Sequence, residues 1–152
     1  MPRALSDATV RSMPELPEVE FARGCLERWL QGRVLREVRV APSRLLRGAD
    51  ARLFDACVGR AVAQVDRRGK WLRIRCEGGP GWLMHLGMTG RVVRLPVGDR
   101  PHVRASWPVE GDPPGAALID PRGFGRLLPG LSEEIDASVE WLQLGPDAWR
   151  DC

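Results

Sequence analysis

Residues 13–20, Met-Pro-Glu-Leu-Pro-Glu-Val-Glu, place a proline and a glutamate directly behind an internal methionine. If synthesis begins at Met13 and this methionine is removed, Pro14 carries a free secondary amine. A secondary amine can attack a sugar carbon and form an iminium, whereas the amide nitrogen of an internal proline cannot. The segment therefore predicts covalent chemistry for one state of Pro14 and none for the other.

A second segment of chemical interest is basic. Arg67-Arg68-Gly69-Lys70 is expected in a turn between two strands, and Arg73 and Arg75 follow on alternate positions of the next strand. Alternate strand positions share one face, so the two arginines form a basic stripe beside a basic turn. Contact with a phosphate backbone is one use of such a surface. A solvated sheet edge that charge protects from aggregation is an equally good interpretation.

Two glycine-rich segments carry further candidates. In residues 84–90, His85 leaves a predicted strand and Met88 lies in a turn. Taken alone, both favour structural roles, although an exposed methionine could wedge into a base stack. Residues 120–125, Asp-Pro-Arg-Gly-Phe-Gly, form a predicted turn that presents Arg122 and Phe124 outward. Because glycines flank Phe124, we expect few local neighbours to bury it, which indicates a functional loop.

The elements that must position these residues are a leading helix and a series of short strands. Apolar residues recur at helical spacing from Val19 to Leu30, which predicts a helix over residues 17–30. Asp50 has the character of an N-cap for a second, short helix through Cys57. Strands are predicted over residues 34–40, 61–66, 71–76, 81–85, 90–95, 103–109 and 116–119. Short strands separated by glycine and proline turns favour an antiparallel sandwich or barrel.

Composition narrows the class of protein. The 152 residues suffice for one domain with a core and are too few for two of ordinary size. No apolar run approaches the roughly 20 residues that cross a bilayer, and residues 1–12 lack the centre of a signal peptide, so we expect a cytoplasmic protein. The 4 cysteines are scattered, which favours buried reduced thiols over a zinc site. A net charge of +3 weakly favours a polyanionic partner.

Taken together, five segments resemble the formamidopyrimidine-DNA glycosylases: residues 13–20, 67–70, 85–88, His102 and residues 120–125. Their order and spacing also match, although each motif is weak alone. The related endonuclease VIII branch shares the amino-terminal Pro-Glu and a similar basic turn, whereas His-Leu-Gly-Met and Glu-Leu-Pro-Glu favour the purine-repair branch. The resemblance implies a mainly β fold with flanking helices, a two-layer antiparallel β-sandwich.

The resemblance also implies a catalytic group. Pro14 would be the nucleophile that attacks the deoxyribose anomeric carbon and displaces a damaged base, giving a covalent imine with DNA. Glu15 would act as general acid and base near the sugar ring oxygen. Glu18 would orient the proline amine or hold the helix N-terminus, where negative charge is favoured. Lys70 would serve the strand-breaking elimination or bind a phosphate beside the lesion.

The DNA-binding residues implied in this way are Glu18, Lys70, His85, Met88, His102, Arg122 and Phe124. Among them, His85, His102 and Arg122 would hold the DNA. Met88, Arg122 and Phe124 would fill the gap left when the damaged nucleotide is flipped out.

For domain organisation, we expect residues 1–12 to be a disordered leader or a misassigned start, with the true start at Met13. Residues 13–149 would form the amino-terminal catalytic domain. The family continues into a helix-two-turns-helix segment and a four-cysteine zinc finger, which this sequence does not contain. The family's zinc would need that finger, so no cofactor and no metal are expected in this chain.

The predicted function is that of a bifunctional DNA glycosylase and AP lyase that excises oxidised purines, formamidopyrimidine and 8-oxoguanine, in base excision repair. Its partner would be double-stranded damaged DNA, with no membrane association, and it would act as a nucleoid-associated monomer. The alternative is a truncated relic of the family that binds DNA and is catalytically weak or inactive, since half of the DNA cleft would be missing.

Overall fold

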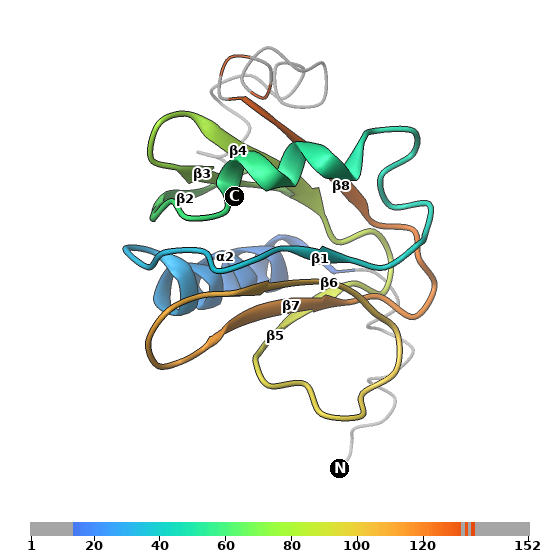
Figure 1. The fold of residues 1–152 in the computed structure, drawn as a ribbon. Coiled ribbons are helices and arrows are strands. Elements are labelled where there is room, and N and C mark those ends of the chain that lie inside the picture. Colours follow the sequence, from blue (N-terminus) through green and yellow to red (C-terminus); the bar gives the residue numbers. More distant parts are fainter. Residues whose placement is uncertain (1–13, 132, 134, 136–152) are drawn as a thin grey trace.

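The computed structural model describes residues 14–131, 133 and 135. Two four-stranded antiparallel sheets form its framework. The first sheet has the order β1 (Arg39–Val40), β6 (Val103–Pro108), β7 (Gly115–Ile119) and β5 (Arg91–Arg94). The second has the order β2 (Val62–Arg68), β3 (Trp71–Cys76), β4 (Pro80–His85) and β8 (Arg126–Leu131). Figure 1 shows the sheets as two layers, so the predicted mainly β, two-layer antiparallel sandwich is confirmed.

The core lies between the sheets because the strands alternate in burial. Along β3, Leu72, Ile74 and Cys76 are buried, while the residues between them are half-buried. Trp82 of β4 and Trp107 of β6 are fully buried and stack across the layers, with ring centroids 5.1 Å apart. This stack joins the two sheets through their largest side chains.

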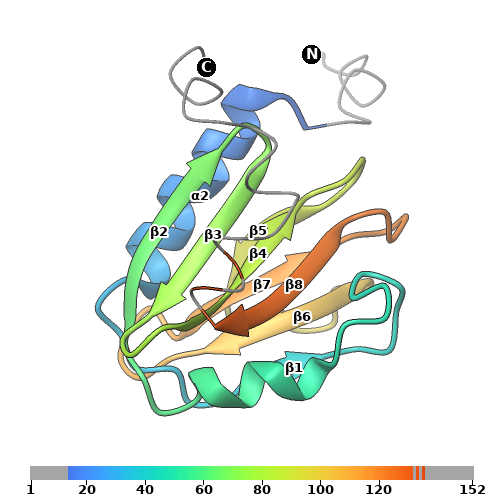
Figure 2. The ribbon, with the colours of Figure 1, turned by 90° about the horizontal axis from the view of Figure 1, so that it is seen from above.

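Helix α2 (Leu16–Leu30) lies along one open side of the sandwich and contacts strands of both sheets, as Figures 1 and 2 show. Its prediction from residue 17 to residue 30 is confirmed to within one residue. The helix turns one face to the core, made of Val19, Ala22, Cys25, Leu26 and Leu30. Its first turn is thereby fixed relative to both sheets.

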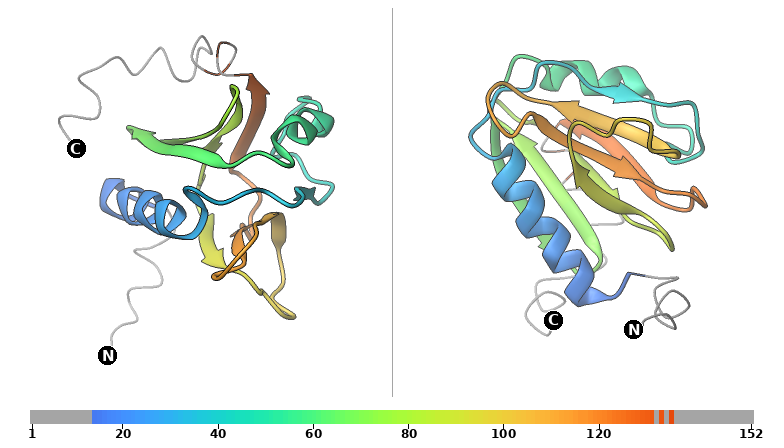
Figure 3. Two further views of the ribbon diagram at one scale, coloured as in Figure 1. Left: turned by 60° about the vertical axis from the view of Figure 1, so that its left-hand side comes forward. Right: turned by 90° about the horizontal axis from the view of Figure 1, so that it is seen from below.

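The second predicted helix is a 3₁₀ helix, η1 (Ala51–Cys57), that contacts β4 and β8 at the other side of the sandwich, visible in Figure 3. The Asp50 side chain accepts a hydrogen bond from the Arg52 N–H at 2.9 Å, which confirms the predicted N-cap. Cys25, Cys57 and Cys76 are buried and free. The predictions for residues 1–12, for Cys152 and for the end of the domain at residue 149 lie outside the described residues.

The expected strand over residues 34–40 is wrong for most of its length. Only Arg39–Val40 pairs regularly, with β6. Before that, Val34 forms a bridge with Ala61 and Leu35 forms one with Val109. The segment alternates between the two sheets, so its apolar pattern reflects a crossover between layers.

Two further expectations need correction. Arg67 and Arg68 belong to β2 itself, and the turn before β3 consists of Gly69 and Lys70. Strand β8 was not expected, since its Pro129-Gly130 pair is typical of a turn. An edge strand tolerates proline because its outer N–H groups need no ladder partner, and β8 is the edge strand beside β4. No helix in the part of the chain that the structure describes is long and apolar enough to cross a membrane.

Candidate functional site

The candidate site begins where the chain enters α2. Pro14 precedes the helix and Glu15 is its N-cap residue. The backbone N–H of Glu15 donates to Oε1 of Glu18 at 2.9 Å, one half of a capping box. Of the two roles expected for Glu18, this contact supports the second, holding the helix N-terminus. The cap also fixes the direction in which Pro14 leaves the helix.

Lys70 reaches this helix end from the second sheet. It lies in the turn between β2 and β3, where Gly69 has a φ of 60°, a left-handed conformation that glycine adopts without strain. The Lys70 Nζ lies 3.8 Å from Oε1 of Glu15. The structure therefore brings together two of the three predicted catalytic side chains, directly beside the third, Pro14.

Arg67 holds the turn in place through internal contacts. Its Nε donates to Oε1 of Glu20 on α2 at 2.8 Å, and its Nη1 donates to the Gly69 carbonyl at 3.1 Å. Arg73 is likewise occupied, with Nη2 2.8 Å from Oδ2 of Asp66. Arg73 of the predicted basic stripe thus makes an internal ion pair, and Lys70 of this turn lies beside Glu15.

His85, at the end of β4, is half-buried beside the same turn. Its Nδ1 accepts a hydrogen bond from the Gly87 N–H at 2.9 Å, and its ring meets Trp71 edge to face at 5.0 Å. Burial lowers the pKa of His85, and the nearby positive charges of Lys70, Arg126 and Arg47 lower it further. A neutral imidazole whose Nδ1 accepts must carry its proton on Nε2, so His85 offers one N–H donor.

Met88 and the residues 120–125 form a second group beside the first. Met88 is half-buried in the turn after β4, and Arg122 is exposed. The Phe124 ring contacts two guanidinium groups, with its centroid 4.6 Å from Arg44 Cζ and 5.1 Å from Arg122 Cζ. Arg44 approaches Phe124 from a segment 80 residues earlier in the sequence, so this neighbour could not be seen from the residues around Phe124.

His102 meets the second group through its backbone. It is exposed and has a φ of 66°, and its carbonyl accepts the backbone N–H of Asp120 at 3.0 Å. Its backbone therefore supports the start of the 120–125 loop. The structure gives its side chain no contact with Pro14, Glu15 or Lys70 among the described residues.

Sequence reasoning missed two arginines of this site. Arg44 Nε donates to the Gly123 carbonyl and Arg47 Nη2 donates to the Phe124 carbonyl, each at 3.4 Å. Arg47 also contributes positive charge near His85. The only signal was the basic composition of Ser43-Arg44-Leu45-Leu46-Arg47, because their contacts arise from the fold.

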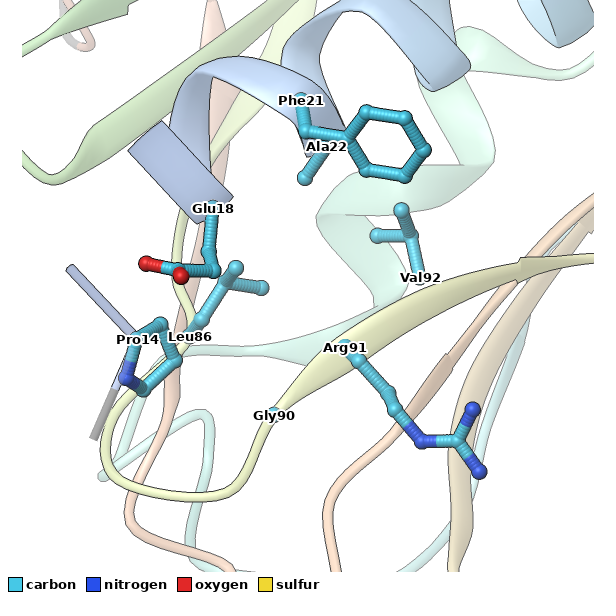
Figure 4. Close-up of a pocket in the computed structure, with 8 residues that line it drawn as sticks. All are labelled: Pro14, Glu18, Phe21, Ala22, Leu86, Gly90, Arg91 and Val92. Carbon is cyan, nitrogen blue, oxygen red and sulfur yellow. The ribbon is translucent and has the colours of Figure 1, made fainter. Parts of the chain in front are cut away.

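A mostly apolar cavity of about 240 Å³ opens beside Pro14, between α2 and the start of β5. Figure 4 shows Pro14 and Glu18 at one end of this cavity and Phe21 with Val92 at the other. The complete lining is Pro14, Glu18, Phe21, Ala22, Leu86, Gly90, Arg91 and Val92. Pro14 therefore forms part of the wall of an apolar cavity.

The described residues contain no group of three or more His, Cys, Asp or Glu side chains that could hold a metal ion. If Pro14 is the first residue, the chemistry available at this site is that of a secondary amine, a carboxyl group and a lysine, with arginines nearby that attract anions. Such a set suits covalent attack on a sugar joined to phosphates.

Comparison with known proteins agrees with this description. Residues 13–127 match the family model of the formamidopyrimidine-DNA glycosylase N-terminal domain. The formamidopyrimidine-DNA glycosylase of Halorhodospira halophila is 40% identical over 139 residues, which covers 89% of this chain and 50% of the relative.

Solved structures give the same result. The MutM (Fpg) protein of Thermus thermophilus is similar with a TM-score of 0.70 and 38% identity, over 88% of this chain and 46% of that one. Wild-type Lactococcus lactis Fpg (MutM), solved with DNA containing an oxidized pyrimidine, is similar with a TM-score of 0.68 and 25% identity, over 80% of this chain and 46% of that one. The chain spans about half the length of the proteins it matches.

Proposed function

Because this chain belongs to the formamidopyrimidine-DNA glycosylase family through its N-terminal domain, we propose that it is the catalytic domain of a DNA glycosylase with AP lyase activity. Its substrates are oxidised purines, formamidopyrimidine and 8-oxoguanine, in double-stranded DNA. The reaction belongs to base excision repair and takes place on the nucleoid in the cytoplasm.

The observation that carries this proposal is the contact between Lys70 and Glu15. Their charged atoms lie 3.8 Å apart, directly beside Pro14, although the residues are 55 positions apart in the sequence. The Glu15 carboxylate, next to Pro14, can accept a proton from the attacking amine.

The chemistry requires Pro14 to have a free secondary amine. Its nitrogen attacks C1′ of the damaged nucleotide, and the base leaves with the electron pair of the broken C1′–N bond and takes up a proton. Glu15 accepts the amine proton and delivers it to the ring oxygen O4′ as the C1′–O4′ bond breaks, leaving an iminium between Pro14 and C1′. Loss of a proton from C2′ then expels the 3′ phosphate and breaks the strand. Lys70 either assists this elimination or binds the phosphate beside the lesion.

A hydrogen-bond donor and an exposed arginine near the site support DNA as the partner. His85 offers its Nε2–H, and Arg122 is exposed beside Met88 and Phe124. In this proposal, His85 and Arg122 contact phosphates. Met88 and Phe124, together with Arg122, fill the gap left by the flipped nucleotide.

Reductive trapping tests the proposal. Protein prepared to begin at Pro14 is mixed with an abasic-site duplex and sodium borohydride, which reduces an iminium to a stable amine. We expect a covalent protein–DNA adduct that peptide mass mapping assigns to Pro14.

The matched control carries one added serine ahead of Pro14, which retains every side chain but turns the proline nitrogen into an amide. It should give no adduct at Pro14. Equal trapping by both proteins at another residue would contradict the proposed nucleophile.

A second candidate function is DNA binding with little or no turnover. It is favoured by the observation that the described site draws only on the part of the relatives that this chain matches, about half of their length. Small misplacements of a reacting group lower rates by orders of magnitude. Tight binding of the abasic duplex without any adduct from the Pro14 form would select this candidate.

A further inference from the structure

Asp120 is a fully buried carboxylate that no catalytic step uses. Its Oδ1 accepts the Thr89 hydroxyl at 2.7 Å and the Gly123 N–H at 3.1 Å, and its Oδ2 accepts the Gly125 N–H at 2.9 Å. A buried carboxylate is tolerated only when donors surround it, and here the donors come from two different loops. Asp120 therefore ties the turn after β4 to the 120–125 loop.

Thr89 extends this link to the backbone of Arg122. Its Oγ1 donates to Asp120 and at the same time accepts the backbone N–H of Arg122 at 3.0 Å. A hydroxyl can do both because it carries one proton and two lone pairs. Thr89 is the neighbour of Met88 and Arg122 lies two residues before Phe124, so one hydroxyl sets the spacing between the side chains proposed to enter the DNA.

The two loops also touch through their backbones. A Cβ at Gly87 would lie 2.6 Å from the backbone of Phe124 and Gly125, and a Cβ at Gly125 would lie 2.7 Å from the His85 carbonyl. Arg104 also holds the 120–125 loop. Its Nε donates to the Asp120 carbonyl at 2.8 Å and its Nη2 donates to the Pro121 carbonyl at 3.1 Å. The loops can shift relative to each other only if these bonds break.

We propose that Asp120 and Thr89 act as positioning residues which hold Met88, Arg122 and Phe124 as one preassembled unit for probing damaged DNA. The inference rests on the proposed function, since it takes those three side chains as the ones that fill the gap in the duplex. A preassembled unit loses less conformational entropy on insertion than two independent loops do. This preassembled unit with Asp120 and Thr89, here called the clamp, should therefore bind DNA with a gap, such as an abasic site, more tightly than intact DNA. Phosphate contacts should contribute equally to both affinities.

The test compares Thr89→Val with Thr89→Ser. Valine keeps the shape but loses both hydrogen bonds, whereas serine keeps the hydroxyl. We expect the ratio of Kd for an intact duplex to Kd for an abasic-site duplex to fall about tenfold in Thr89→Val, in keeping with the loss of one or two hydrogen bonds. In Thr89→Ser the ratio should stay within about twofold of the wild-type value. The salt dependence of Kd should not change in either variant, because the phosphate contacts remain.

Amide hydrogen exchange provides a measurement without DNA. The Arg122 N–H should exchange slowly in the wild type and in Thr89→Ser and become fast in Thr89→Val, while core amides of β4 stay protected. An unchanged Kd ratio in Thr89→Val, or an equal loss of affinity for both duplexes, would overturn the clamp. Covalent trapping at Pro14 tests the proposed function separately. The Kd ratio tests only the clamp, because binding to an abasic site needs no covalent step.

Discussion

At the scale of single residues, the site combines a histidine with three cations. Burial of His85, together with Lys70, Arg126 and Arg47, holds its pKa below the usual value of about 6.5. The unfolded chain therefore takes up a proton at this position before the folded protein does. His85 contributes stability above about pH 6.5 that is lost as the pH falls through its folded-state pKa.

This sign gives a first prediction. The free energy of unfolding should fall between pH 7.5 and pH 5, and the fall should be smaller in His85→Asn, whose side-chain oxygen can still accept the Gly87 N–H without titrating. Urea unfolding followed by circular dichroism at the two pH values measures the difference. A wild-type protein and variant with the same pH dependence would contradict a lowered His85 pKa.

Sequence motifs named candidate residues for this site, whose roles stay predictions, but did not reveal the residues around them. Pro14, Glu15 and Lys70 were identified from a resemblance in motif order, and the fold places the last two within 3.8 Å. Arg44 was not identified, because its contact with Phe124 depends on how two distant loops meet. Asp120 was seen only as part of a motif, since its burial and its partner Thr89 follow from tertiary structure.

At the scale of elements, the Trp82–Trp107 stack joins β4 of one sheet to β6 of the other. Both indoles are fully buried, so truncation of either leaves a cavity that the surrounding strands cannot fill. Trp107→Ala should lower the free energy of unfolding by about 3–5 kcal/mol. Trp29→Ala, on the half-buried end of α2, should lower it less.

Urea denaturation followed by circular dichroism measures both variants without relying on tryptophan fluorescence. Equal losses would mean that the stack does not carry the contact between the layers. The strands of this core were predictable where apolar residues alternate, as in β3. They were not predictable where a segment serves both sheets, as at residues 34–40, or where Pro129 lies in an edge strand.

At the scale of the whole molecule, the positive charges differ in how far they are available to bind DNA. The net charge is only +3, and several arginines are engaged with carboxylates or carbonyls. The turn after β4 and the 120–125 loop lie at one end of the sandwich. The turn between β6 and β7, held by Arg33, lies at the opposite end of the first sheet. DNA affinity should therefore depend on where an arginine is, more than on the total charge.

Salt dependence tests this asymmetry with two variants that remove the same charge. Each phosphate contact adds about 0.9 to the slope of log K against log salt concentration, because one condensed cation is released per contact. Arg122→Gln should reduce the slope by about that amount, since Arg122 is exposed beside the proposed insertion loop. Arg33→Gln should leave the slope unchanged, because its guanidinium already donates to the Asp112 and Pro113 carbonyls at the far end. Fluorescence anisotropy with an abasic-site duplex from 50 to 300 mM salt, roughly the range over which such contacts are measured, gives both slopes. Equal reductions in the two variants would mean that the protein attracts DNA by its overall charge. They would contradict a specific phosphate contact at the 120–125 loop.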